Sequence, residues 1–172
     1  TKYNPEEWVL QAKRAGMKYI VITAKHHDGF ALWPSAVNDW NVASTLYKKD
    51  LLKPLAEACK KHGIKLGFYY SHSVDWSNGG ACNNWDPAGK DDMVNYMNNI
   101  AIPQIKELVT NYGDAPAVLW WDVPAGMNYD YATRILEITK ARPNLIQNNR
   151  LYKMAGHMGV VDMATLEANK GN

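Results

Sequence analysis

The sequence predicts an α/β fold in which parallel strands alternate with helices, and two observations support this. Short β-branched and apolar runs recur along the chain, separated by helical patterns of ten or more residues, as in right-handed βαβ units. Polar and ionisable residues follow the predicted strands, which is where the catalytic residues of a TIM-like (β/α)8 barrel lie. A whole barrel needs roughly 250 residues, so these 172 residues predict a portion of one, about four or five βα units.

The first predicted helix begins at Asn4, because an Asn N-cap is followed by Pro5 at the first helical position and by two acidic residues. Gly16 is expected to end this helix. Residues 19–23 are β-branched and apolar, so we expect them to form a buried strand.

Asp50 opens the second predicted helix, and Gly63 ends it. Its apolar stripe includes Cys59, which is expected to be a small buried residue. The next strand covers 64–70, and the polar loop 71–89 follows.

A long helix is predicted over 91–112, with a bend near Pro103. The later elements are a strand ending at 121, a helix at 130–141, a strand at 145–148 and the start of a further strand at 160–161.

Composition excludes several classes of function. The net charge is +2 and no Lys/Arg run forms a nucleic-acid or anionic-membrane patch. No apolar stretch reaches the ~20 residues of a membrane span. Two cysteines make no disulfide framework, and no Gly-rich nucleotide loop follows a strand.

Seven Trp and ten Tyr against two Phe suit sugar binding, because the side chains of Trp and Tyr join an apolar face to a polar group.

The apolar run 118–121 ends on a single carboxylate, Asp122. A strand here delivers one acid to its carboxyl end inside an aromatic wall. Enzymes that attack the anomeric carbon of a sugar need this combination, so Asp122 is the candidate nucleophile. A retaining glycosidase also needs a second carboxylate ~5–5.5 Å away as acid and base.

Four further side chains stand at the ends of the predicted strands. Arg150 can supply the charge that keeps a nucleophilic carboxylate ionised, and Tyr69 can donate a hydrogen bond to it. His26 and His27 can hydrogen-bond sugar hydroxyls, because neutral imidazole both donates and accepts.

Other interpretations of the same residues stay open. The histidines, with His72 and Asp75, form a possible zinc set of a metal-dependent barrel hydrolase. We expect no metal, because adjacent residues of an extended chain point opposite ways. Four loop tryptophans are either sugar platforms or structural residues: Trp33, Trp40, Trp76 and Trp85.

Several motifs together resemble the catalytic barrel of α-L-fucosidases, glycoside hydrolase family 29. The resemblance runs over nearly the whole chain, with the motifs in the same order. These motifs are His-His-Asp-Gly-Phe-Ala-Leu-Trp-Pro-Ser (26–35), Gly-Phe-Tyr-Tyr-Ser (67–71), Asp75-Trp76, Trp120-Trp121-Asp122 and Asn149-Arg150.

The resemblance implies a retaining enzyme that releases terminal α-L-fucose without a metal or cofactor. It places the nucleophile on Asp122 and the acid/base on Glu167, although Leu166 stands where the family often has Pro. The substrate-binding residues it implies are His26, His27, Tyr69, Trp76 and Arg150.

It also implies that residues 1–172 are a partial catalytic barrel, with the first strand, the last strands and a C-terminal β-sandwich outside this chain. The expected partner is a fucosylated oligosaccharide or glycoconjugate, and the resemblance favours a periplasmic or secreted protein. A fucose-binding barrel without catalysis is the alternative that the Leu166 departure leaves open.

Overall fold

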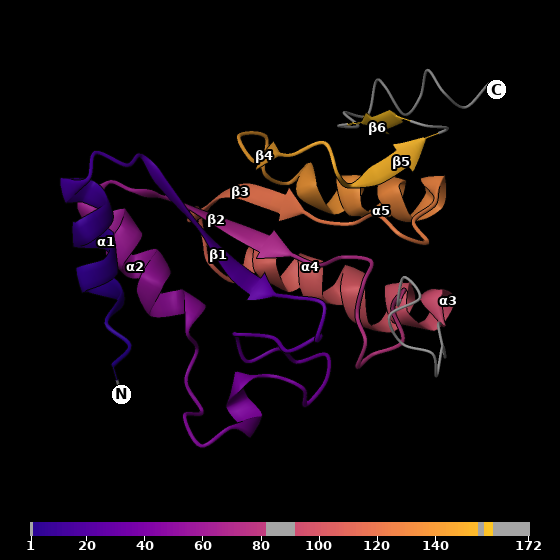
Figure 1. The fold of residues 1–172 in the computed structure, drawn as a ribbon, viewed down its shortest axis with the longest axis horizontal. Coiled ribbons are helices and arrows are strands. Elements are labelled where there is room, and N and C mark those ends of the chain that lie inside the picture. Colours follow the sequence, from indigo (N-terminus) through magenta and orange to yellow (C-terminus); the bar gives the residue numbers. More distant parts are fainter. Residues whose placement is uncertain (1, 82–91, 155–156, 160–172) are drawn as a thin grey trace.

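The computed structural model describes residues 2–81, 92–154 and 157–159 (Figure 1). Within these ranges, no helix is both long and apolar enough to cross a membrane. The elements in chain order are α1 (Pro5–Arg14), β1 (Tyr19–Lys25), the 3-10 helix η1 (Val42–Ser44), α2 (Leu52–His62), β2 (Lys65–Tyr70), α3 (Met93–Tyr96), the π-helix η2 (Met97–Ala101), α4 (Ile102–Thr110), β3 (Pro116–Trp121), α5 (Tyr129–Thr139), β4 (Ile146–Gln147), β5 (Tyr152–Met154) and β6 (His157–Gly159).

The first four strands form one sheet in the order β1-β2-β3-β4, and every neighbouring pair is parallel. In Figure 1 the arrows of β1, β2 and β3 point the same way, and α4 and α5 run beside them. The predicted α/β fold with parallel strands is therefore confirmed. The antiparallel pair β5-β6 was not predicted, and the strand expected at 160–161 lies outside the described residues.

The helix boundaries follow the capping residues that the sequence indicated. Asn4 accepts a hydrogen bond from the Glu7 amide at 3.1 Å and begins α1. Asp50 Oδ1 accepts from the first amides of α2, at 2.7 and 2.9 Å. Gly63 ends α2 with a φ of 72°, in the left-handed region that glycine adopts without strain.

The long helix predicted over 91–112 is three consecutive helical segments, α3, η2 and α4. The wider turn η2 ends two residues before Pro103, which is in the first turn of α4. Proline has no amide hydrogen and its ring clashes with the carbonyl four residues earlier, so the chain relieves the clash with a π-turn. The sequence predicted a bend near Pro103, and the structure has a π-helical segment at this place.

The sheet has one buried face and one open face. On β2 the side chains of Leu66, Phe68 and Tyr70 are buried in the core with the helices. Residues of the opposite face are half-buried or exposed, including Tyr19, which is 57% exposed, and Ile146, which is 66% exposed. The expectation that residues 19–23 form a buried strand is wrong: β1 is at the edge of the described sheet, and none of these five residues is fully buried, although Ile20 and Ile22 pack against the core.

The open face carries the residues that lead to the candidate site. Tyr69 of β2 pairs with Thr23 of β1 and with Trp120 of β3, so these three residues lie in one row across the sheet. Gly67 lies one step earlier, where a Cβ would stand 2.7 Å from the Cβ of Val118. The missing side chain lets β2 and β3 lie close together directly below this row.

Candidate active site

Five side chains meet where the parallel strands end. His26 and His27 follow β1, Tyr69 lies near the end of β2, Asp122 follows β3, and Arg150 comes three residues after β4. The carboxyl ends of parallel strands share one edge of the sheet, so residues far apart in the sequence converge there. The structure thus brings together these five of the seven site residues predicted from the sequence, and a sixth, Trp76, borders them.

Asp122 is held as a carboxylate by three donors. Its Oδ2 accepts from the Tyr69 hydroxyl at 2.6 Å. Its Oδ1 accepts from the Val123 amide at 2.9 Å and lies 3.0 Å from Arg150 Nη2. Partial burial raises the pKa of Asp122, but the Tyr69 hydrogen bond, the Arg150 charge and the Val123 amide outweigh it and hold the pKa below its ordinary value.

The backbone at this position is strained. Val123 is β-branched and has a φ of 35°, a conformation that such residues rarely adopt. The amide of this residue donates to the Asp122 carboxylate at 2.9 Å. Backbone outliers of this kind cluster at functional sites, where the surrounding structure enforces them.

The two histidine rings lie together beside Asp122. Their centroids are 4.2 Å apart, and the His26 ring stacks on Tyr69 with an interplanar angle of 9°. His27 Nε2 lies 3.8 Å from Asp122 Oδ2. The expectation that these side chains point opposite ways is wrong, because the chain leaves the strand here and the Gly29 amide closes a turn onto the His26 carbonyl.

Trp76 also borders the site. Its ring meets the His27 ring edge-on, with centroids 6.0 Å apart, and it is partly exposed. Trp33, by contrast, is fully buried, and its Nε1 donates to Glu107 Oε2 at 2.7 Å. Of the loop tryptophans considered as sugar platforms, Trp33 is therefore structural, and Trp85 lies outside the described residues.

Trp120 is a candidate contact that sequence reasoning missed. It lies two residues before Asp122, in the row that contains Tyr69, and its side chain is 42% exposed. Residues i and i+2 of a strand share a face, so Trp120 and Asp122 lie on the same side of the sheet. The alternation of side chains between the two faces of the strand along residues 118–122 is the sequence signal that could have identified Trp120.

His26, His27 and Asp122 also form the one group of potential metal ligands in the described part of the chain, with ligand atoms within 4.8 Å of one another. The guanidinium of Arg150, 3.0 Å from the carboxylate, opposes a divalent cation there. The other proposed zinc ligands are engaged elsewhere, because Asp75 binds Lys25 and His72 binds the Leu151 carbonyl.

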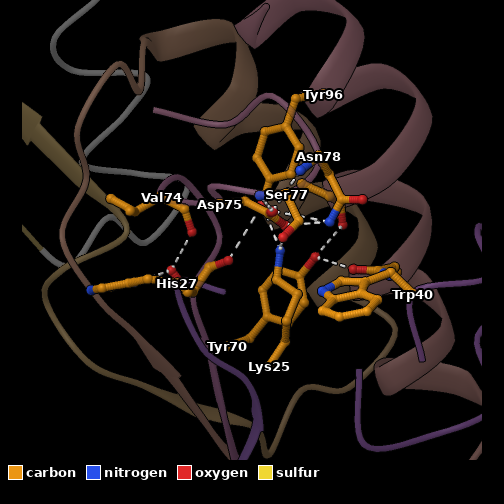
Figure 2. Close-up of polar contacts among 12 residues, drawn as sticks. Lys25, His27, Trp40, Tyr70, Val74, Asp75, Ser77, Asn78 and Tyr96 are labelled. Carbon is orange, nitrogen blue, oxygen red and sulfur yellow. Dashed lines mark hydrogen bonds and ion pairs between the residues drawn. The ribbon is translucent and has the colours of Figure 1, made fainter. Parts of the chain in front are cut away.

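A buried polar cluster that was not predicted lies next to the site (Figure 2). Lys25 Nζ is fully buried and donates to Asp75 Oδ2 and to the Tyr96 hydroxyl, both at 2.7 Å. Burial lowers the pKa of Lys25, and the Asp75 charge opposes this shift. Asp75 Oδ1 also accepts from the Ser77 and Asn78 amides, so one carboxylate joins β1 to the loop after β2.

His72 predicts a pH-dependent stability. Its Nε2 donates to the Leu151 carbonyl at 3.0 Å, and burial lowers its pKa from 6.5 to about 4. The unfolded state therefore binds more protons between these values, and about 3 kcal/mol of stability is expected to be lost as pH falls from 6.5 to 4. Urea unfolding of wild type and His72→Gln across this range checks it. If the free energy of unfolding changes with pH in the same way in both proteins, the assignment of this pH dependence to His72 is contradicted.

The predicted acid/base, Glu167, lies outside the described residues, as does Asp162 of the same motif. Its role stays a prediction.

Comparison with known proteins identifies the family. The family model described as α-L-fucosidase matches residues 1–170. The chain belongs to the α-L-fucosidase family. It is 35% identical over 154 residues to α-L-fucosidase 1 of Arabidopsis thaliana, and 33% identical over 133 residues to the tissue α-L-fucosidase of Rattus norvegicus. These alignments cover 85% and 71% of this chain, and 28% and 26% of the two relatives.

Solved structures of the family share the fold. The α-L-fucosidase of Lactobacillus casei in complex with α-L-fucose product superposes with a TM-score of 0.81 at 36% identity, over 87% of this chain and 51% of that one. Isoenzyme 1 of Paenibacillus thiaminolyticus gives a TM-score of 0.79 at 36% identity, over 90% and 39%. This fucosidase-family chain thus spans about a quarter of the curated relatives and up to about half of the structural ones.

Proposed function

We propose that this chain carries the nucleophile of a retaining exo-α-L-fucosidase that releases terminal α-L-fucose from glycans. The observation that supports this best is the state of Asp122: a carboxylate kept ionised by Tyr69 and Arg150, beside two imidazoles, in a chain of the α-L-fucosidase family. An ionised, oriented carboxylate is what attack on an anomeric carbon requires.

In the proposed mechanism, an oxygen of Asp122 attacks the anomeric carbon from the face opposite the leaving group. The bond to the leaving oxygen breaks as an acid, for which Glu167 is the prediction, donates a proton to it. The product is a fucosyl ester on Asp122. The same acid, now a base, takes a proton from water, which attacks the anomeric carbon and frees the carboxylate. Two inversions retain the configuration.

The other residues act on binding and charge. Tyr69 and Arg150 orient the Asp122 carboxylate, one on each oxygen. His26 and His27 face the same carboxylate and supply hydrogen bonds to sugar hydroxyls. Trp76 and Trp120 offer partly exposed aromatic faces to the sugar.

Hydrolysis of 4-nitrophenyl α-L-fucoside by the full-length protein tests the proposal. We expect turnover that survives EDTA, with α-L-fucose as the first product seen by proton NMR before mutarotation. The β-anomer as first product would contradict retention. Fucose binding without hydrolysis of any fucoside would support the non-catalytic alternative, and activity lost in EDTA and restored by zinc would support a metal-dependent hydrolase.

Removing the Tyr69 hydroxyl is expected to shift the acidic limb of the pH profile. Tyr69→Phe deletes a hydrogen bond that favours ionised Asp122, so the pKa of that carboxyl rises and the low-pH limb of kcat/KM moves to higher pH. We also expect kcat/KM at neutral pH to fall about tenfold. Tyr112→Phe is the matched control, because Tyr112 makes a similar bond to Asp50 away from the site. An unmoved limb in Tyr69→Phe would reject the assigned contact.

A further inference from the structure

The loop after β2 holds His27 at two points (Figure 2). The Trp76 amide donates to the His27 carbonyl at 2.8 Å, which fixes the backbone. His27 Nδ1 lies 2.7 Å from the Ser71 hydroxyl oxygen, which fixes the ring. Ser71 is fully buried directly after β2, and its own amide donates to the Lys25 carbonyl at 3.0 Å. The position of this hydroxyl is therefore set by the sheet.

Counting protons assigns the tautomer of His27. The Ser71 hydroxyl oxygen lies 2.6 Å from the Val74 carbonyl oxygen. A carbonyl only accepts, so the single hydroxyl proton of Ser71 is committed to Val74. The 2.7 Å contact with His27 then needs a proton from the other side, and Nδ1 must supply it. A neutral imidazole carries one ring proton, so Nε2 holds a lone pair.

That lone pair faces the candidate nucleophile. Nε2 lies 3.8 Å from Asp122 Oδ2, too far for a hydrogen bond. Burial lowers the pKa of His27, the neighbouring His26 lowers it further, and Asp122 opposes the shift, with a net lowering that favours the neutral ring. Two acceptors thus stand side by side, and a group placed between them must bring its own proton.

We propose that Ser71 is a positioning residue that fixes His27 as the Nδ1–H tautomer, so that Nε2 accepts a hydrogen bond from one hydroxyl of the bound sugar. This rests on the proposed function for the identity of the ligand, but the tautomer itself does not. The site then selects for a hydroxyl at that ring position, because a methyl ether, a fluorine or a hydrogen there has no proton to donate.

The imidazole nitrogen shifts of the full-length protein, labelled with ¹⁵N-histidine, test the tautomer without any turnover. The His27 signals are assigned by their loss in His27→Gln. We expect a protonated, pyrrole-type Nδ1 and an unprotonated, pyridine-type Nε2 at neutral pH. A protonated Nε2 in the wild-type protein would overturn the proposal, and this measurement needs no serine variant to fold.

Ser71→Ala separates positioning from a purely structural role. Without the acceptor at Nδ1, the ring is expected to gain the Nε2–H tautomer, which can donate toward Asp122. Ser73→Ala is the matched control, because Ser73 is a buried serine of the same loop whose hydroxyl donates to the Ala125 carbonyl. Ser73→Ala should keep the wild-type His27 spectrum. Equal spectra for wild type and Ser71→Ala would also overturn the proposal.

Kinetics supply the second readout. If His27 holds a sugar hydroxyl equally in the ground and transition states, Ser71→Ala raises KM about tenfold with kcat nearly unchanged. Ser71→Thr keeps the hydroxyl and should restore KM. Monodeoxy and monofluoro fucosides locate the hydroxyl that His27 binds. At one ring position, replacing the hydroxyl by hydrogen or by fluorine should lower the kcat/KM of the wild type by the same factor. Neither replacement should lower the kcat/KM of His27→Gln. If the fluoro compound is clearly the better substrate at that position, Nε2 donates a hydrogen bond to the fluorine, and the proposal is overturned. A protein with the expected spectrum and no hydrolysis would refute the proposed function and leave the tautomer standing.

Discussion

Asp122→Gly in the full-length protein is expected to lower kcat on an aryl α-L-fucoside by at least about 10³-fold, because no other group replaces the attacking carboxylate. Added azide should restore turnover. Azide fits the space left by the side chain and attacks the anomeric carbon from the same face, so the recovered product should be the β-L-fucosyl azide. Formation of this inverted product, identified by NMR, distinguishes a lost nucleophile from a damaged fold.

The matched control is Asp114→Gly. Asp114 is a fully exposed aspartate that pairs with Arg142 just before β3, far along the strand from Asp122. It tests for the general effect of replacing an Asp by Gly next to this strand and should retain nearly all activity. Near-normal hydrolysis by Asp122→Gly, or azide products of the α configuration, would reject Asp122 as nucleophile.

The largest stability loss is expected from Lys25→Met. The substitution leaves the Asp75 carboxylate buried without its cation, 2.7 Å from where Nζ stood. Breaking a buried pair by removing one partner costs about 3–5 kcal/mol of unfolding free energy. The urea midpoint of the full-length protein, with the slope of the transition checked for change, measures this.

Two comparisons make this result interpretable. Lys140→Met breaks an equally short but solvent-exposed pair with Glu137, and should cost no more than about 0.5 kcal/mol. Lys25→Met combined with Asp75→Asn removes both charges and should recover part of the loss, because an uncompensated charge is the main penalty. A Lys25→Met protein as stable as Lys140→Met would show that the buried pair contributes little.

Local signals in the sequence predicted the fold well. Asn4, Asp50 and Gly63 act through hydrogen bonds and dihedral angles within a few residues, so their effects are visible in a short window. The strand and helix alternation then limits the topology to right-handed parallel units. The β5-β6 hairpin escaped prediction because its strands are only three residues long.

The candidate site was predicted in part. The meeting of Asp122, Tyr69 and Arg150 follows from their shared place at strand ends. Lys25 was missed, because a lysine is almost never fully buried unless it is paired and its partner Asp75 lies 50 residues away. The joint presence of His26 and His27 at the site was predicted, but the expectation that their side chains point opposite ways was wrong, because β1 ends at Lys25, before this pair.

The π-helix η2 has a consequence for how this chain tolerates insertions and deletions. A π-turn holds about one residue more than an α-turn, and each α-helical residue advances about 100° around the axis. Because both kinds of turn complete about 360°, deleting one residue from Met97–Ala101 would restore a regular α-turn and leave Tyr96 directed at Lys25 and Ile105 in the core. The same deletion within α4 would rotate the two ends of the helix relative to each other by about 100°, so a one-residue deletion should be tolerated far better in η2 than in α4.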